Sequence, residues 1–496
     1  MSYWMIIGLV IVGCTPPLLT LSTLWQKKEW RIDRLKEHLR AEGFFRQLFG
    51  ILRPIIVLGA ILTNVSWGII ALAAVSVIQI SLRRQRLPVW TLKTIVLVST
   101  SLGITIATAL LLPIATVYIA LPLFQSIPLL ISWVLFLPVD YTLKNHVMNQ
   151  ATKIRSTYEN LTFVGITGSV GKTTTKEIID HVMKDKNVLC TPAYVNSEMG
   201  VAKWLLKELP KHNTDEKLIL IVEMGAYRIG EIANLCKIVK PSIGVITYIG
   251  TQHIALFGSQ EKLQKAKGEL FAALPSDGHA IFNADSSLCR VVGQKLDCST
   301  TSIGTASPCD VLAQDIEETG DGIHFSIEGQ KYNVPLHGTH NITNVLLAIS
   351  VAELLEMQKS DIIKSLKTFK PPSSTFSVQK KRGVTLLDDT HNASPESFRA
   401  AIAWAKSQPA NNKILLTPGL IELGNAEDKI HRELGTQASG IFSRVIFTGK
   451  HGIDAFAKGY TGEVERLHKQ TTPILSEDLL LCVGRVSGAV INRILP

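Results

Sequence analysis

The segment 163-FVGITGSVGKTTTKEII-179 has the pattern of a β-strand, a glycine-bearing turn and a helix that opens with three threonines. Glycines let the backbone turn so that successive N–H groups face one anion, and the helix adds its positive N-terminal end. Lys172 would reach the outer phosphates of a nucleotide, and the Thr173 hydroxyl would ligate Mg²⁺. The segment therefore predicts a phosphate-binding loop, although Ile166 stands where the strict P-loop motif begins with glycine.

A largely apolar region precedes this loop, and its uncharged runs are 4–25, 54–80 and 94–139. Each run is long enough to cross a bilayer, and the third could cross twice with a turn near Pro113. Buried core helices are the alternative, and a cleaved signal peptide would explain only the first run. We therefore expect a transmembrane region with three to four apolar spans over residues 1–150.

Charge is unevenly distributed in this chain, whose net charge is +10. Basic residues crowd 25–53 and 81–93, beside the apolar runs, which is typical of segments that flank a membrane. They lack interleaved aromatic residues, so we expect no nucleic-acid partner. Because a nucleotide-using domain faces the cytoplasm, four plain crossings would place 25–53 outside, against the positive-inside tendency. Residues 54–80, with Asn64 in mid-span, are the candidate for a re-entrant or interfacial segment.

Beyond residue 150, short β-rich runs alternate with amphipathic helical patterns, which is typical of a parallel sheet covered by helices. The strands expected in a central domain, 151–370, are 161–166, 217–223, 243–248 and 279–283, with a helix over 259–273 and a small antiparallel insert over 307–336. A second block, 371–496, has expected strands at 384–388, 413–417, 444–448 and 479–483. The expected fold is thus an α-helical membrane segment followed by α/β: a P-loop parallel-sheet central domain and a C-terminal Rossmann-like α/β domain.

Alone, the phosphate loop fits a motor, a kinase, a transporter ATPase or a ligase. Further motifs follow it in order: 196-NSEMGVA-202, 223-EMGAYRIGEI-232, 246-ITYIGTQHIALFGS-259, 265-KAKGELF-271, 337-HGTHNITNVLLAI-349, 388-DDTHNASPESF-398 and 419-GLIELGNAEDKIHRELG-435. Together they resemble the Mur ligase family, and most closely its members that add D-alanyl-D-alanine to a UDP-linked muramoyl tripeptide.

The resemblance implies an enzyme in which ATP phosphorylates a substrate carboxylate and an amine then displaces phosphate from the acyl phosphate. Cations and oriented N–H groups would offset the repulsion between the two anions. By resemblance, the catalytic residues are Lys172, Glu223, His253 and Lys267, and Mg²⁺ is held by Thr173, Glu223, His253 and a carbamylated Lys267. Carbamylation requires a neutral amine, so we expect a lowered pKa for Lys267. The alternative is a plain surface lysine beside Lys262 and Lys265.

The same resemblance assigns the nucleotide and substrate contacts. ATP would be bound by Thr167, Gly168, Ser169, Val170, Gly171, Lys172, Thr173, Thr174, Asn341, Asn344, Asp389, His391 and Asn392. Asn341 and Asn344 would contact the adenine, whose edge suits the donor and acceptor of an amide. Asn196 would lie near the phosphates and the substrate. The three residues of the last domain would close onto the nucleotide, and their alternative is an Asx-type turn without a ligand.

Substrate handling departs from the family pattern. The small α/β domain that usually holds the UDP-sugar is replaced here by the apolar region. The usual interdomain proline-glycine-arginine is 371-PPSST-375, without an arginine, and the C-terminal Lys-Gly-Ser-Arg turn is 483-VGRVS-487, without the lysine. Because the phosphate and Mg²⁺ residues remain, we expect ATP chemistry on an altered acceptor.

The sequence therefore predicts a multi-pass cell-membrane protein whose catalytic domains face the cytoplasm and form amide bonds at the expense of ATP, with Mg²⁺. Its expected partners are peptide or amino-acid substrates, nucleotide- or lipid-linked, and most plausibly a cell-wall precursor. A poly-glutamate or capsule-type ligase would use the same chemistry. A membrane protein driven by a P-loop ATPase belongs to another class, although the apolar runs contain no charged residue to mark an ion path. A catalytically inactive scaffold is the third hypothesis.

Overall fold

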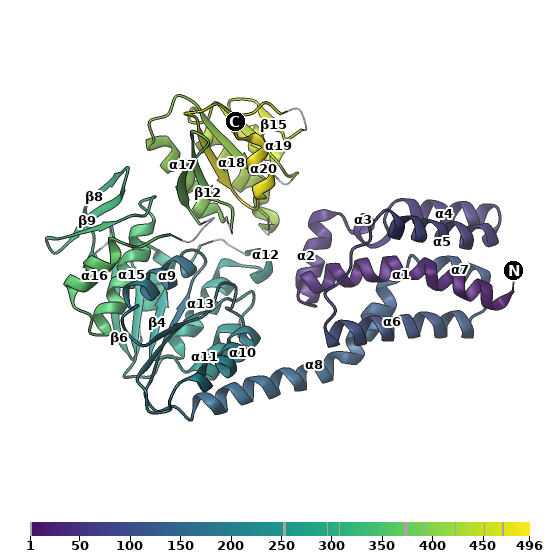
Figure 1. Cartoon of the computed structure of the whole chain (residues 1–496), viewed down its shortest axis with the longest axis horizontal. Coiled ribbons are helices and arrows are strands. Elements are labelled where there is room, and N and C mark those ends of the chain that lie inside the picture. The colour runs from purple at the N-terminus through teal and green to yellow at the C-terminus, as the bar shows by residue number, and fades with distance from the viewer. Residues whose placement is uncertain are drawn as a thin grey trace. The chain divides into compact units, whose positions relative to one another are not determined.

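The computed structural model describes residues 2–250, 254–294, 296–306, 308–371, 375–391, 393–421, 423–450, 452–468 and 471–496. The chain divides into two compact units, Met1–His146 and Val147–Pro496, termed here the helical unit and the α/β unit. One long helix, α8 (Ser126–Arg155), begins in the first unit and ends in the second (Figure 1).

The helical unit consists of α1 (Tyr3–Lys27), α2 (Ile32–Glu42), α3 (Phe44–Phe49), α4 (Leu52–Leu62), α5 (Val65–Ser81), α6 (Leu92–Leu111), α7 (Ala115–Ala120) and the first part of α8. Within the described residues, α1, α6 and α8 are the helices long and apolar enough to cross a membrane. Pro17 in α1 has no N–H, so the carbonyl of Gly13 lacks its helical donor. Ser76 of α5 donates to this carbonyl (Oγ–O 3.2 Å), which fastens α5 to α1.

Residues 54–80, the candidate for a re-entrant or interfacial segment, form two helices in place of one continuous span. The helix stops after Leu62, and Asn64 adopts an extended conformation. The Asn64 side chain accepts a hydrogen bond from the N–H of Ser66 (2.8 Å) and so caps the start of α5. At 11 residues, α4 is about 16 Å long, too short to cross a bilayer by itself.

Together α4 and α5 form a helical hairpin. Gly68 packs so closely on Ala60 that a Cβ at the glycine would overlap the alanine side chain. Near the open end, Arg53 of α4 donates to Gln79 of α5 (Nη2–Oε1 2.9 Å). The chain therefore enters and leaves the hairpin at the same end.

The helices also extend past the uncharged runs and include Arg53 in α4, Lys93 in α6 and Asp140 in α8. Lys93 Nζ lies 2.8 Å from Asp140 Oδ1, and the hydroxyls of Ser101 and Ser132 are 3.1 Å apart. These contacts show that α6 and α8 run antiparallel. The charged side chains of these helices thus lie next to the uncharged runs, which themselves contain none.

The central part of the α/β unit is a parallel sheet with the strand order β2-β3-β1-β4-β5-β6-β7 in the described residues. Its strands are β1 (Leu161–Thr167), β2 (Val188–Cys190), β3 (Leu218–Glu223), β4 (Ile243–Ile246), β5 (His279–Asn283), β6 (Ser299–Gly304) and β7 (Val311–Leu312). The helices of this part are α9 (Lys172–Val182), α10 (Glu198–Glu208), α11 (Glu231–Val239), α12 (Ile254–Phe257), α13 (Gln260–Ala272), α14 (Ser287–Gly293), α15 (Asn341–Leu354) and α16 (Lys359–Leu366), with a 3-10 turn at Leu209–Lys211. The expected parallel-sheet domain is confirmed (Figure 1).

Two further sheets complete the α/β unit. The insert is antiparallel and consists of β8 (Gln314–Thr319), β9 (Gly322–Ile327) and β10 (Gln330–Val334). The last sheet has the order β11-β12-β16-β13-β14-β15, with β11 antiparallel to β12 and the other pairs parallel. Its strands are β11 (Ser377–Lys381), β12 (Val384–Asp389), β13 (Lys413–Thr417), β14 (Arg444–Phe447), β15 (Val464–Arg466) and β16 (Leu479–Val483). Its helices are α17 (Pro395–Ser407), α18 (Glu427–Ala438), α19 (Ile453–Gly459) and α20 (Gly488–Ile494), with a 3-10 turn at Gly424–Ala426.

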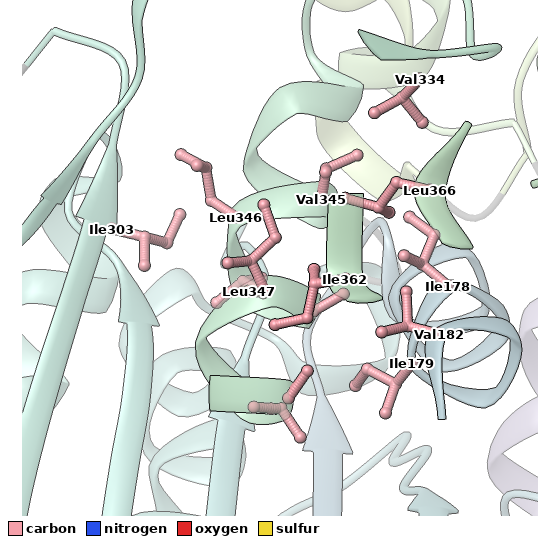
Figure 2. Packing of buried hydrophobic residues seen from close by; sticks show 14 of the residues in the cluster. Ile178, Ile179, Val182, Ile303, Val334, Val345, Leu346, Leu347, Ile362 and Leu366 are labelled. Carbon is pink, nitrogen blue, oxygen red and sulfur yellow. The ribbon is translucent and has the colours of Figure 1, made fainter. Parts of the chain in front are cut away.

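One hydrophobic cluster of the central part holds α9 in place. Figure 2 shows Ile178, Ile179 and Val182 of α9 beside side chains of α15 and α16, among them Leu346 and Ile362. These α9 residues recur at three- and four-residue spacing, so they share the buried face of the helix. The C-terminal half of α9 is therefore packed against α15 and α16.

Candidate functional site

The glycine loop, residues 168–171, joins β1 to α9. Gly168 and Gly171 have φ of 150° and 87°, which favour glycine. A Cβ would overlap Thr247 Oγ1 at Gly168 and Asn344 Oδ1 at Gly171. Within the described residues, the N–H groups of 170–174 donate to no backbone carbonyl, and the first that does is Thr175, to Gly171 (2.8 Å). The loop and first turn thus present a row of unpaired N–H donors, the arrangement that binds an anion.

Two side chains of the expected phosphate site lie over this loop. The N–H of Ser169 donates to Tyr248 (2.6 Å) and its Oγ accepts from the N–H of Gly250 (3.1 Å), so Ser169 ties the loop to the segment after β4. Lys172 Nζ donates to the carbonyls of Gly168 (2.8 Å) and Ser169 (3.3 Å). Burial lowers the pKa of Lys172, and the Glu223 carboxylate opposes this shift. Lys172 is therefore placed at the loop, as expected.

Glu223 ends β3, and the register pairs it with Ile166 of β1, next to the glycine loop. Thr173 Oγ1 donates to Glu223 Oε2 (2.9 Å), and Asn196 Nδ2 donates to Oε1 (3.2 Å). These three residues are termed the Glu223 cluster. A hydroxyl in the first turn of α9 and a carboxylate at the carboxyl end of β3 are the hard oxygen ligands that Mg²⁺ prefers. The donor set therefore fits Mg²⁺, and Asn196 lies on the carboxylate.

Lys176 is a buried cation beside this cluster that sequence reasoning missed. Its side chain is 1% exposed, and its Nζ donates to the carbonyl of Thr191 (2.7 Å) and lies 4.0 Å from Glu223 Oε2. The Thr191 hydroxyl accepts from the N–H of Glu223 (3.0 Å). Thr191 thus holds the backbone of Glu223, and Lys176 lies beside its carboxylate. The spacing of Lys176 could have indicated its burial, since it follows Lys172 by one turn and shares a helix face with the buried Ile179.

Lys267 lies on the apolar face of α13, between the buried Leu263 and Leu270. Its residue is 4% exposed, whereas Lys262 and Lys265 are exposed, so the alternative of a plain surface lysine is wrong.

The electrostatic setting of Lys267 favours the neutral amine. Burial, followed by repulsion from Lys172, lowers the pKa of Lys267 to about 7, while Glu231, Glu223 and Glu269 act in the opposite direction. Among the described residues, no hydrogen bond or ion pair holds its ammonium group. The structure thus brings Lys267 into electrostatic contact with Lys172 and Glu223, and its carbamylation stays a prediction.

The two asparagines of α15 face the glycine loop. Asn341 Nδ2 donates to the carbonyl of His337 (2.8 Å), and Asn344 Nδ2 donates to Asn341 Oδ1 (2.9 Å). Thr175 Oγ1 donates to Asn344 Oδ1 (3.3 Å), and Gly171 packs on the same amide. The asparagines therefore brace the start of α9, and their contact with adenine stays a prediction.

In the last domain, Asp389 ends β12 and is 6% exposed. Its Oδ1 accepts from the N–H of Phe376 (3.3 Å), and Oδ2 has no hydrogen-bond partner among the described residues. Burial raises the pKa of Asp389 to about 6. An Asx-type turn is present, but Asp388 makes it, with Oδ1 accepting from the N–H of Thr390 (3.2 Å). His391 lies with its ring centroid 5.2 Å from that of Tyr194.

Two predicted site residues, His253 and Asn392, lie outside the described residues, as does the middle of the 371–375 linker. In the part of the chain that is described, no group of three or more His, Cys, Asp or Glu residues is arranged to hold a metal ion. The metal-binding potential therefore rests on Thr173 and Glu223, with Lys267 nearby.

Much of the α/β unit is similar to known proteins. Residues 166–352 match the model of the Mur ligase middle domain. A UDP-N-acetylmuramoyl-tripeptide–D-alanyl-D-alanine ligase from Synechocystis sp. is 34% identical over 303 residues, which are 60% of this chain and 64% of that protein. The chain thus spans slightly less than two thirds of this relative.

Solved structures agree on the fold. A crystal structure of MurF from Acinetobacter baumannii has a TM-score of 0.64 at 24% identity, and the matched region is 71% of this chain and 80% of that chain. The MurF ligase from Thermotoga maritima, solved in complex with ADP, has a TM-score of 0.61 at 25% identity, and the matched region is 71% of this chain and 82% of that chain.

Proposed function

Because the chain carries a Mur ligase middle domain at residues 166–352, we propose that it is an ATP-dependent ligase that extends a cell-wall peptide precursor and is anchored in a membrane. The observation that carries the proposal is the meeting of the glycine loop, the Glu223 cluster and Lys267 at the carboxyl end of the central sheet. The ADP complex of the Thermotoga maritima MurF supports the use of ATP.

In this mechanism the N–H groups of 170–174 and Lys172 bind the phosphates of ATP. The substrate carboxylate attacks the γ-phosphorus, the bond to the β-γ bridging oxygen breaks, and ADP leaves. An amine then attacks the acyl carbon, loses a proton, and displaces inorganic phosphate. When bound, Mg²⁺ would neutralise charge on the phosphates, and Thr173 and Glu223 are the described residues that would hold it. Lys172 and the N–H row stabilise the charge that develops in transfer.

Lys267 has a separate role in the proposal. Its neutral amine adds to CO₂, a carbon–nitrogen bond forms, and one proton is released, so that a cation becomes a carboxylate-like anion. Since the pKa of Lys267 is about 7, a substantial fraction of the amine is neutral at physiological pH. His253 and the adenine contacts of Asn341 and Asn344 belong to the same proposal.

Anchoring in the membrane rests on α1, α6 and α8, which are long and apolar enough to cross. The hairpin α4–α5 enters and leaves at one end, so it adds either no crossing or two. The basic segments 25–53 and 81–93 and the chain beyond residue 147 then come out on the same side. This arrangement obeys the positive-inside tendency, which four plain crossings would violate, and it puts the ATP site in the cytoplasm.

The test uses the full-length chain in detergent micelles with ATP, Mg²⁺ and candidate muramoyl peptides and amines, and the product is identified by its mass. The proposal predicts a product heavier than the peptide by one amine minus water, formed with stoichiometric ADP. Lys172→Ala should abolish both. ATP hydrolysis without any acceptor would favour an ATPase-driven membrane protein, and a ladder of added glutamates would favour the poly-glutamate ligase. Equal, background-level rates of ATP turnover in the wild-type chain and in Lys172→Ala would indicate a catalytically inactive scaffold.

A further inference from the structure

The open end of the α4–α5 hairpin contains an arginine without an anionic partner. Arg53 is half-buried, and Nη2 donates to Gln79 (2.9 Å), a neutral side chain. Its Nε is buried and has no hydrogen-bond partner among the described residues. The chain has no acidic residue from 43 to 139, and no ion pair to Arg53 is found in the described ranges. A half-buried guanidinium therefore keeps both charge and donors available.

A hydrogen-bond network builds this end of the hairpin onto α1. Gln79 Nε2 donates to Gln85 Oε1 (2.9 Å). Gln85 Nε2 in turn lies 3.2 Å from the carbonyl of Pro16 and 3.2 Å from Thr20 Oγ1. The turn that follows α5 is thus fixed in place, and it also displays the exposed Arg83, Arg84 and Arg86. Arg53, Gln79, Gln85 and these three arginines are termed the arginine site.

Two other arginines of the helical unit are compensated. Arg31 pairs with Asp33 (Nη2–Oδ2 2.6 Å), and Arg34 Nη1 lies 2.8 Å from Glu29 Oε1. If the arginines only provided general positive charge at a membrane surface, we would expect no difference between the paired and the unpaired arginines. Arg46 has no ion pair within the described residues either, but it is exposed to solvent, whereas Arg53 is half-buried and has three exposed arginines in the turn after α5. This combination indicates a specific anion at the arginine site.

We propose that the arginine site binds the phosphate-bearing headgroup of an anionic lipid. Guanidinium groups match phosphate oxygens in pairs, and charged groups inside a membrane protein favour a compensating partner. The helices that lead to the site expose apolar side chains that suit acyl chains, namely Ile55 and Leu58 of α4 and Ile78 of α5, each more than half exposed. A soluble phosphate would leave this apolar surface unused.

The experiment titrates the full-length protein in maltoside micelles with dioleoyl phosphatidic acid, dioleoyl phosphatidylcholine or inorganic pyrophosphate, and native mass spectrometry counts the bound molecules. Binding is measured without ATP or acceptor, so its outcome is independent of the ligase proposal. Phosphatidic acid should bind at least ~10-fold more tightly than phosphatidylcholine. Arg53→Gln should remove most of this preference, and Arg46→Gln, an exposed arginine with the same charge change, should keep it.

Each outcome decides the inference. Equal affinity for the two lipids, or equal effects of Arg53→Gln and Arg46→Gln, would overturn it. Pyrophosphate that binds as tightly as phosphatidic acid would overturn the assignment to a lipid. If Arg53→Gln fails to fold, the triple variant Arg83→Gln, Arg84→Gln, Arg86→Gln takes its place, and an unchanged lipid preference in that variant contradicts the proposal.

Discussion

The two units of the chain place apolar and charged side chains in opposite ways. In the helical unit, large apolar residues such as Leu58, Leu92 and Leu135 are more than half exposed, whereas buried polar residues such as Ser76 and Thr105 sit between helices. In the α/β unit, the described large apolar residues that remain exposed are scattered singly: Tyr194, Ile229, Val291, Ile316, Leu354, Ile421 and Leu475.

Buried charge shows the complementary difference. In the α/β unit, Lys176, Glu223, Lys267 and Asp389 are each less than a tenth exposed, and all but Lys267 lie in α9 or at strand ends. A soluble fold rarely buries such groups without a partner or a function. The helical unit thus exposes a large apolar surface, which agrees with the proposed membrane anchor, while the α/β unit buries charged side chains, three of them near the glycine loop, where we propose that the chemistry occurs.

The largest effect should follow the loss of a buried charge. We expect Lys267→Ala to lower the ligation rate by roughly 10³-fold, because the anion formed on this amine would be lost. Acetate or formate should restore part of the rate. Lys262→Ala, an exposed lysine on the same helix, is the matched control and should leave the rate unchanged. Full activity in Lys267→Ala would remove the carbamate from the account.

A smaller loss is expected at Lys176, which supports Glu223 without touching substrate. Lys176→Met should reduce kcat by ~10–100-fold through misplacement of the carboxylate, with a change in the KM for ATP of less than ~3-fold. Lys176→Arg should retain more activity than the methionine variant. Steady-state kinetics and thermal unfolding together provide the check, since a purely structural role would lower Tm and leave kcat of the folded protein unchanged.

The ionisation of Asp389 should make the free energy of unfolding depend on pH. The pKa of Asp389 is about 6 in the fold against an ordinary value near 3.8, so above pH 6 folding must bury an ionised carboxylate, which lowers the stability of the fold. Asp389→Asn should therefore stabilise the protein by about 3 kcal/mol at pH 8. The advantage should shrink as pH falls through 6 and vanish below 4. Unfolding midpoints of both proteins at pH 5 and pH 8 measure it, and a pH-independent difference would contradict the assigned pKa.

The smallest effect is expected where the two units are separated. A chain that starts at Lys144 keeps Val147 and Ala151 of α8, which pack into the core of the α/β unit. It should be soluble and bind ATP within ~3-fold of the full-length affinity, since its nucleotide residues are intact. A chain that starts at Ser156 loses these core contacts and should be less stable. Calorimetric titration of both with ATP tests this separation.

Long apolar strands of the α/β unit could be predicted because β-branched runs such as 217–223 leave little choice of structure, whereas the short β2 and β15 were missed. Asn64 marked 54–80 as unusual, but apolar composition alone does not reveal that this residue caps a new helix. Lys176 was missed because a lysine in a helical pattern is usually exposed. Its burial depends on Thr191 and Glu223, which the sequence places 15 and 47 residues away.

His431 illustrates the same limit. The motif that contains it matches a known family, but the sequence suggests no sharp role. In the fold, its Nδ1 lies 2.8 Å from the carbonyl of Glu427, and its Nε2 accepts from the N–H of Leu420 (3.0 Å). His431 therefore holds the loop before α18. The Glu427 carbonyl is a local partner within α18, whereas the contact with Leu420 is provided by the tertiary structure.

The formation of an acyl phosphate is the central claim, and isotope transfer tests it most directly. The peptide that supplies the carboxylate would be prepared with a heavy oxygen isotope at both carboxylate oxygens and incubated with the full-length protein, ATP and the amine. The account predicts that the released inorganic phosphate carries one heavy oxygen from the peptide. Amide product accompanied by unlabelled phosphate, or phosphate release without amide, would contradict it.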